Sequence, residues 1–258
     1  MTDAALVTGA SSGIGREIAR VHAARGGDLV ITARRAAPLE ALKAELEAAN
    51  GVAVHSVALD LGAPGGAEDL IARVEALGLR IGVLVNNAGF GGRGAHVERP
   101  LADELAMIDL NVRALVTLTH HFGGAMAARG AGRILQVGST AGFMPGPQQA
   151  VYFATKAFVG SFSQAVDAEL RPRGVTCTLL APGYVESGFA ERADLAGTKL
   201  VSSGGATAAD VARFGYDAMM RGRLVAVNEV GLRLGTRWIV PFVPRRLLMR
   251  IIGGMQTP

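Results

Sequence analysis

The chain has 258 residues, of which 50% are hydrophobic and 5% aromatic, and its net charge is only +4. A nucleic-acid-binding protein would spread a basic surface with aromatic residues along a groove, so this composition argues against that class. The single cysteine, Cys177, excludes an internal disulfide and a multi-cysteine metal site. The chain shows neither a signal peptide nor the roughly 20 consecutive apolar residues of a membrane span, so we expect a cytoplasmic protein.

Short apolar runs alternate with helical patterns from the N-terminus onward. We predict strands at Ala4–Thr8, Asp28–Ala33, Val52–Leu59, Val83–Asn86, Ile134–Gly138, Val175–Ala181 and Leu224–Val227. We predict helices at Ile14–Arg25, Pro38–Ala49, Gly65–Leu77, Leu101–Arg129, Tyr152–Arg171 and Ala208–Arg221. Such alternation forms right-handed βαβ units, and no linker interrupts the series. The sequence therefore predicts an α/β fold, with residues 1–258 in a single domain around a doubly wound parallel sheet of about seven strands.

A glycine-rich turn, Thr8-Gly-Ala-Ser-Ser-Gly-Ile-Gly15, joins the first predicted strand to the first predicted helix. Gly9, Gly13 and Gly15 allow a tight turn whose backbone N–H groups approach a pyrophosphate, and the helix N-terminus adds partial positive charge. The spacing is GxxxGxG and differs from the common GxGxxG fingerprint. An ordinary glycine-rich turn is the alternative interpretation.

The residues after the second predicted strand favour NADP(H) over NAD(H). An NAD site usually carries Asp or Glu at this point, where it binds the ribose hydroxyls. Here the position is Ala33, and Arg34 and Arg35 follow it. A guanidinium can bind the 2′-phosphate of NADP(H) bidentately. The alternative is a pair of solvated loop arginines.

Six motifs occur in order along the chain, namely Thr8–Gly15, Asn86-Asn-Ala-Gly89, Asn111, Ser139, Tyr152-Phe-Ala-Thr-Lys156 and Pro182-Gly-Tyr-Val185. Together they resemble the short-chain dehydrogenase/reductase family over nearly the whole chain. The resemblance implies a Rossmann fold, an NADP(H)-dependent oxidoreductase acting on a carbonyl or alcohol, and a homodimer or homotetramer.

Tyr152 and Lys156 lie one turn apart on one face of the predicted helix. A phenol with its usual pKa of about 10 is a poor base at neutral pH, and we expect a nearby ammonium and an oxidised nicotinamide to lower that pKa. Ser139, at the end of a predicted strand, can donate a hydrogen bond to the substrate oxygen. The resemblance further implies that Lys156 holds the nicotinamide ribose and that Asn111 positions a water in a proton relay.

The resemblance also implies the cofactor contacts. The residue pair Asp60-Leu61 resembles the adenine site, the turn 87–89 the adenine-ribose site, and the segment 182–189 the segment that closes on the nicotinamide carboxamide. Asn86 is instead interpreted as a residue that ties the sheet together. The full set of expected cofactor contacts is Gly9, Ser11, Ser12, Gly13, Ile14, Gly15, Arg34, Arg35, Asp60, Leu61, Asn87, Ala88, Gly89, Tyr152, Lys156, Pro182, Gly183, Val185 and Ser187.

The C-terminal residues carry a basic amphipathic pattern. A helix that begins at Pro244 would place Leu247, Leu248, Ile251 and Ile252 on one side and Arg246 and Arg250 on the other. Such a helix could pack on the substrate lid or on a partner subunit, attach to an anionic membrane surface, or form a loose tail, and packing is favoured. We expect 187–206 to form a substrate lid and 231–258 a C-terminal amphipathic extension, which together make the substrate pocket apolar.

Three functions are compatible with these residues. The first is reduction of a ketone or aldehyde by NADPH, and the second is an alcohol dehydrogenase that works in the oxidative direction. The third is a non-catalytic NADP(H)-binding regulatory protein, which is disfavoured because Asn111, Ser139, Tyr152 and Lys156 are all present. No metal site is predicted, because no His, Asp or Glu cluster has ligand spacing.

Overall fold

The computed structural model describes residues 3–186, 188, 190, 193–195, 197–198, 201 and 204–256. A parallel sheet crosses the molecule in the strand order β3-β2-β1-β4-β5-β6-β9. Its strands are β1 (Ala4–Thr8), β2 (Leu29–Ala33), β3 (Val54–Ala58), β4 (Ile81–Asn86), β5 (Gly132–Val137), β6 (Val175–Leu180) and β9 (Val225–Ala226). The predicted α/β fold with a parallel sheet of about seven strands is confirmed.

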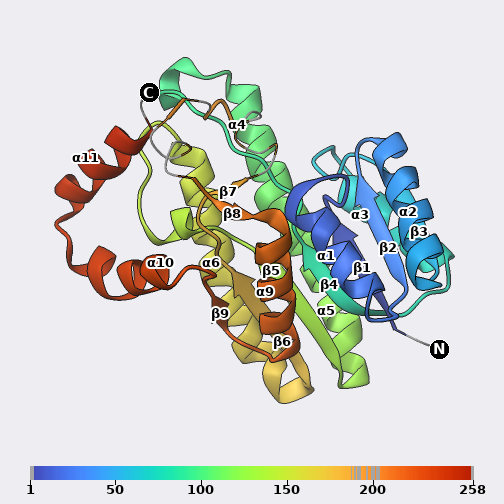
Figure 1. Cartoon of the computed structure of the whole chain (residues 1–258). Coiled ribbons are helices and arrows are strands. Elements are labelled where there is room, and N and C mark those ends of the chain that lie inside the picture. Colours follow the sequence, from blue (N-terminus) through green and yellow to red (C-terminus); the bar gives the residue numbers. More distant parts are fainter. Residues whose placement is uncertain are drawn as a thin grey trace.

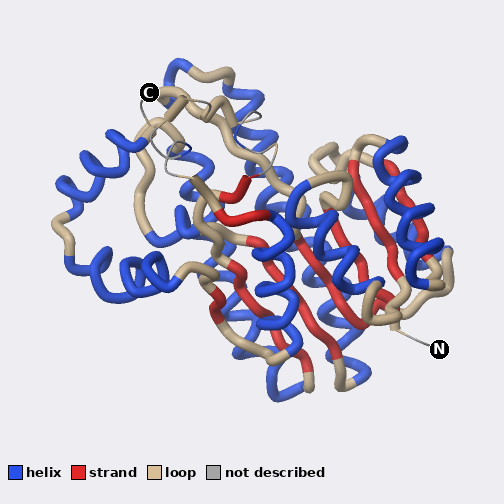
Figure 2. Tube along the Cα trace, viewed as in Figure 1, coloured by secondary structure: helices blue, strands red, loops and turns tan. Residues whose placement is uncertain are grey.

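Helices cover both faces of this sheet (Figures 1 and 2). One face carries α1 (Gly13–Ala23), α2 (Ala36–Asn50) and α9 (Ala208–Met220), and the other carries α3 (Gly66–Ala76), α5 (Leu115–Arg129) and α6 (Ala150–Leu170). Short 3-10 turns lie at His96–Glu98, Thr140–Phe143 and Arg171–Arg173. The sheet is therefore doubly wound.

The central strand β1 shows why the strands are apolar on both sides. All five of its residues are buried. Ala5 and Val7 pack with the layer of α1 and α9, whereas Ala4 and Leu6 pack with the layer of α3 and α5. Alternate residues of a strand face opposite sides, so a strand covered on both faces has an unbroken apolar sequence.

The structure differs from the sequence prediction at two places. The predicted long helix is divided into α4 (Leu101–Ile108), a π-helical turn (Asp109–Ala114) and α5. The π-helical turn has only six residues, which are too few for its spacing to be told from that of the α-helices on either side. The parallel strands β7 (Val185–Glu186) and β8 (Ala206–Thr207) were also missed, because two residues are too few to show an alternating pattern.

The last residues, Val230–Gln256, form what we call the C-terminal arm. It comprises α10 (Val230–Leu234), a π-helical turn (Gly235–Ile239), a 3-10 turn (Val240–Phe242) and α11 (Arg245–Met255). In Figure 1 the arm (red) stands beyond the β9 edge of the sheet. No helix in the described part of the chain is long and apolar enough to span a membrane.

The predicted helix after Pro244 is present as α11, but its apolar side is only partly covered. Leu248 is buried and Ile252 half-buried, whereas Leu247 and Ile251 are 48% and 50% exposed. The rest of the described chain therefore covers only part of the apolar side that was predicted for this helix. The arm bends at its π-helical and 3-10 turns, so packing is concentrated on one part of α11.

Candidate active site

A cavity of about 990 Å³ opens at the carboxyl ends of β1, β4, β5 and β6. The order of the sheet reverses between β1 and β4, which is the place where open α/β sheets bind ligands. The predicted site residues at its wall are Gly9, Ser11, Ser12, Gly13, Ile14, Arg34, Arg35, Asp60, Leu61, Asn87, Ala88, Gly89, Ser139, Tyr152, Lys156, Pro182, Gly183 and Val185. Gly15 and Asn111 do not reach this wall, and Ser187 lies outside the described residues.

The glycine-rich turn depends on its glycines for two different reasons. Gly9 and Gly13 have φ angles of +68° and +55°, which residues with a side chain rarely adopt. Gly15 has no such angle, but a Cβ there would lie 2.6 Å from the carbonyl oxygen of Gly9. Gly15 therefore lets the first turn of α1 approach the loop closely, although it does not line the cavity.

The hydroxyl of Thr8 joins this turn to the end of β4. It donates to the carbonyl of Val85 (3.2 Å) and accepts from the N–H groups of Asn87 (2.9 Å) and Ala88 (3.0 Å). Asn86 points elsewhere and donates to Thr119 of α5 at 3.0 Å. Gln136 of β5 donates to the same hydroxyl at 2.8 Å, so Thr119 links β4 and β5, which agrees with the interpretation of Asn86 as a residue that ties the sheet together.

Arg34 and Arg35 follow β2 directly and are exposed at the wall of the cavity. Neither guanidinium forms an ion pair with any residue that the structure describes. Asp60 follows β3, and its carboxylate accepts a hydrogen bond from the N–H of Gly62 at 2.9 Å within the same turn. The open turn at Gly9, the start of α1 and two free cations together fit a phosphorylated dinucleotide.

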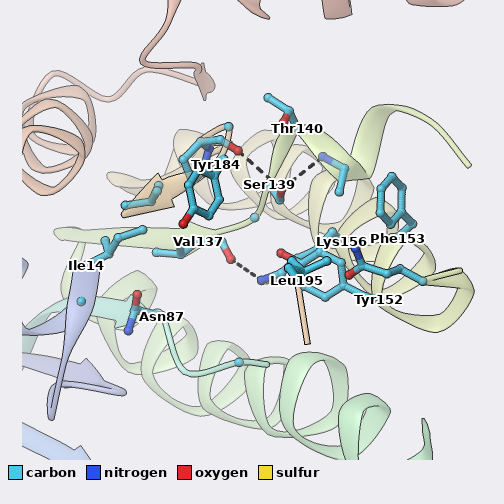
Figure 3. Close-up of a pocket in the computed structure, with 18 of the residues that line it drawn as sticks. Ile14, Asn87, Val137, Ser139, Thr140, Tyr152, Phe153, Lys156, Tyr184 and Leu195 are labelled. Carbon is cyan, nitrogen blue, oxygen red and sulfur yellow. Dashed lines mark hydrogen bonds between the residues drawn. The ribbon is translucent and has the colours of Figure 1, made fainter. Parts of the chain in front are cut away.

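Tyr152 and Lys156 lie one turn apart on α6, and both are buried. The ammonium of Lys156 lies 5.8 Å from the centroid of the Tyr152 ring. It donates to the carbonyl of Val137, the last residue of β5, at 2.9 Å (Figure 3). The strand thus fixes the lysine beside the tyrosine at the carboxyl end of the sheet.

The burial of this pair controls both pKa values. Burial raises the pKa of Tyr152 to about 12, and its hydrogen bond with Ser139 acts in the opposite direction. Burial lowers the pKa of Lys156 to about 8. The expectation that an ammonium and an oxidised nicotinamide lower the pKa of Tyr152 concerns the enzyme with cofactor bound; in the chain without cofactor, desolvation outweighs the hydrogen bond with Ser139. At neutral pH, Tyr152 consequently holds its proton.

Ser139 follows β5 and begins the turn Thr140–Phe143. Its hydroxyl accepts from the N–H of Ala141 at 3.1 Å and donates to the carbonyl of Pro182 at 3.4 Å. Figure 3 shows this side chain at the cavity wall, in the same view as Tyr152. The two hydroxyls are therefore placed where they can meet one substrate oxygen.

Asn111 lies in the π-helical turn and is buried. Its Oδ1 accepts from the N–H of Phe90 (3.1 Å), and its Nδ2 donates to the carbonyl of Phe90 (2.9 Å) and to Thr155 (3.1 Å). A Cβ on Gly89 would lie 2.9 Å from this Oδ1 and 3.6 Å from Nζ of Lys156. Asn111 thus ties the loop after β4 to α6, and both its side chain and that of Lys156 lie close to Gly89.

The far side of the cavity, which we call the substrate chamber, draws most of its described residues from 231–258, one of the two segments that the sequence analysis expected around an apolar pocket. Its apolar walls are Met144, Phe153, Leu195, Leu232, Ile239, Val240, Val243, Leu248, Ile251, Ile252 and Met255. Its polar members include Gln149, Thr236 and Gln256. The charged residues among the described lining are Arg34, Arg35, Asp60 and Lys156, which belong to the expected cofactor and catalytic groups.

Known proteins resemble this chain in sequence and in structure. The family model described as short chain dehydrogenase matches residues 3–196. A sulfoacetaldehyde reductase of Chromohalobacter salexigens is 40% identical over 233 residues, or 89% of this chain and 85% of the relative. A short-chain dehydrogenase from Sphingobium yanoikuyae in complex with NADPH has a TM-score of 0.85 and 32% identity, over 99% of this chain and 98% of that chain. A bulky-bulky ketone specific alcohol dehydrogenase from Comamonas testosteroni has a TM-score of 0.80 and 28% identity, over 96% and 94%.

Proposed function

Because the chain belongs to the short-chain dehydrogenase family and is an oxidoreductase, we propose that it reduces ketones or aldehydes with NADPH, with Tyr152 as proton donor. The observation that carries this proposal is the buried hydroxyl of Tyr152, hydrogen-bonded to Ser139 at the wall of a dinucleotide-sized cavity. The unpaired guanidinium groups of Arg34 and Arg35 in the same cavity favour the 2′-phosphate of NADPH.

The catalytic residues act on the carbonyl oxygen. Bound NADPH supplies a hydride to the carbonyl carbon. The hydroxyls of Ser139 and Tyr152 donate hydrogen bonds to the oxygen as negative charge develops there. Tyr152 then transfers its proton to that oxygen, which completes the alcohol, and the ammonium of Lys156 stabilises the phenolate that remains.

Tyr152 holds its proton in the chain without cofactor, and this is the form that can donate to a carbonyl oxygen in reduction. Alcohol oxidation needs the phenolate as a base, and a bound oxidised nicotinamide would favour that form. The oxidative dehydrogenase is the second candidate.

We further propose that the substrate is a bulky, apolar ketone. The described walls of the substrate chamber are mostly apolar, and none of the described residues assigned to it carries the cation that a sulfonate group would require. This composition does not favour the substrate named for the sulfoacetaldehyde reductase that the chain resembles in sequence. It agrees better with the substrate named for the Comamonas testosteroni enzyme.

A substrate screen tests this proposal. We expect NADPH-dependent reduction of benzophenone with a kcat/KM at least about 100-fold above that of acetone or sulfoacetaldehyde, because two buried rings contribute several kcal/mol of apolar binding. The measurement is NADPH consumption at 340 nm. Equal rates with acetone or sulfoacetaldehyde would show that the apolar-substrate proposal is wrong. No consumption with any carbonyl would contradict the reductase itself.

The pH profile should report the charge of Lys156. Its pKa is lowered to about 8, so the ammonium is present below that pH and is lost as the pH rises through it. Since kcat/KM reflects the free enzyme, we expect kcat/KM for NADPH to be flat below pH 7 and to fall about tenfold per unit above pH 8. Lys156→Arg, whose side chain stays charged, should lose this decline even if its rate is lower. A wild-type profile that stays flat to pH 10 would contradict the assignment.

We propose that residues 187–206 act as the substrate lid, since β7 and β8 pair on either side of this segment. Of its described residues, Leu195 lines the chamber, and Asp194 accepts from Arg93 at 3.0 Å.

We also propose a cytoplasmic homo-oligomer. Leu101 and Leu105 on α4 are 65% and 50% exposed, as expected of residues that a second subunit covers.

A further inference from the structure

The end of the C-terminal arm returns to the helix that carries Tyr152. Gln256 follows α11, and its Oε1 accepts a hydrogen bond from Nε2 of Gln149 at 2.6 Å. Gln149 is the residue before α6, three positions ahead of Tyr152. Both amides line the substrate chamber and are only 3% and 2% exposed. Two residues that are 107 positions apart in sequence thus form one buried contact in the chamber wall.

Packing next to this hydrogen bond brings α11 against the catalytic region. Ile252 packs on the apolar cluster that contains Tyr152 and Phe153. Gly253 lies against Pro147, and a Cβ on this glycine would be 3.5 Å from Cβ of the proline. The preceding part of the arm is more open, since Ile239 and Phe242 are 61% and 78% exposed. The position of α11 as a chamber wall therefore depends on its last turn.

The amide pair is sensitive to the loss of one partner. Oε1 of Gln149 is buried without a hydrogen-bond partner among the described residues, so this side chain has a single polar contact to lose. Removing Gln256 alone would leave a buried amide that has no partner at all, which carries the full cost of desolvation. Replacing both amides by apolar side chains of similar size removes that cost.

We propose that the Gln149–Gln256 pair is a specificity-determining clasp, which holds α11 in place as the wall against which a bulky apolar ketone binds. This inference rests on the proposed reductase function. The pair acts through the position of α11 and not on the reacting atoms, so it should govern the KM of large substrates. Small ketones do not reach this wall and depend on it less.

The test compares Gln256→Leu, Gln149→Leu and the double variant in the full-length chain. We expect each single variant to raise the KM for benzophenone about tenfold, with kcat and the KM for NADPH changed less than threefold. The ratio of kcat/KM for benzophenone to that for acetone should fall by the same factor of about ten. The double variant should recover the KM to within threefold of wild type, because no unpaired amide remains.

Gln164→Leu is the matched control, because Gln164 lies on the same helix and, among the described residues, its side chain bonds only to the carbonyl of Gly160 in that helix. If both single variants keep the wild-type KM, or if the double variant is worse than either, the clasp does not exist. If Gln149→Leu does not fold, Gln256→Leu decides alone, since it changes a residue beyond the last helix. A wild-type protein that reduces no ketone would overturn the reductase proposal instead. This outcome can be told from the others because it is measured on the wild type, before any variant is made.

Discussion

Replacement of Tyr152 by Phe is expected to lower kcat for ketone reduction by about 10³ to 10⁵, because it removes both a general acid and a hydrogen bond to the developing oxyanion. The ring and its packing in the buried cluster are retained. The affinity for NADPH should therefore change less than threefold. Single-turnover kinetics and fluorescence titration of NADPH measure the two effects separately.

Tyr216→Phe provides the control for this experiment. Tyr216 is equally buried, but its hydroxyl bonds Nδ1 of His22 at 2.8 Å between α1 and α9, away from the cavity wall. Its loss should lower the melting temperature and leave kcat within twofold. Near-normal reduction by Tyr152→Phe would remove Tyr152 from the role of proton donor.

The second large effect is expected at the cofactor phosphate. Replacing Arg34 and Arg35 together by Ala should weaken NADPH about 100-fold or more, because each charge-assisted hydrogen bond to the 2′-phosphate contributes about 1.5–3 kcal/mol. NADH lacks this phosphate, so its affinity should change less than threefold. Isothermal titration with both cofactors measures the ratio.

Arg73→Ala is the matched variant for these arginines, because Arg73 is also exposed but pairs with Asp69 within α3, outside the cavity. It should alter neither affinity. A parallel loss of NADPH and NADH binding in the Arg34/Arg35 variant would mean that the two side chains hold a group common to both cofactors, and the phosphate assignment would be wrong.

The sheet and its helices could be predicted because each repeats a local pattern. The strands are apolar on both sides, and helices such as α2 carry a stripe, Leu39, Leu42 and Leu46, that reaches the core. The residues expected to bind the cofactor could be predicted because they follow strands whose carboxyl ends meet at one edge. Most of the predicted site residues consequently line one cavity.

The pKa of Tyr152 could not be predicted in the same way. Sequence spacing placed a lysine beside the phenol, and that neighbour suggested a lower pKa. The spacing does not reveal that both groups are buried, and burial proves to be the larger effect on each. The direction of a pKa shift requires the surroundings, which only the folded chain supplies.

The segments around the substrate chamber could be expected from the sequence, but the contacts between its residues could not, because those residues are distant in sequence. Gln149 and Gln256 have no local pattern that links them, and the bends of the arm at 235–242 break the helical spacing. The helix α11 was foreseen, whereas the choice of Leu248 over Leu247 as its buried residue depends on how the whole arm packs.

The arm begins at Val230, whereas the match to the family model ends at residue 196. The groups proposed for hydride and proton transfer thus lie in the shared stretch, and much of the proposed chamber wall lies beyond it. The reaction chemistry and the substrate selectivity would then depend on different segments of one chain. Replacing the arm by that of a relative would then change which ketones are reduced, while the reaction stayed the same. Similarity over the shared stretch alone would accordingly identify the reaction of such an enzyme but not its substrate.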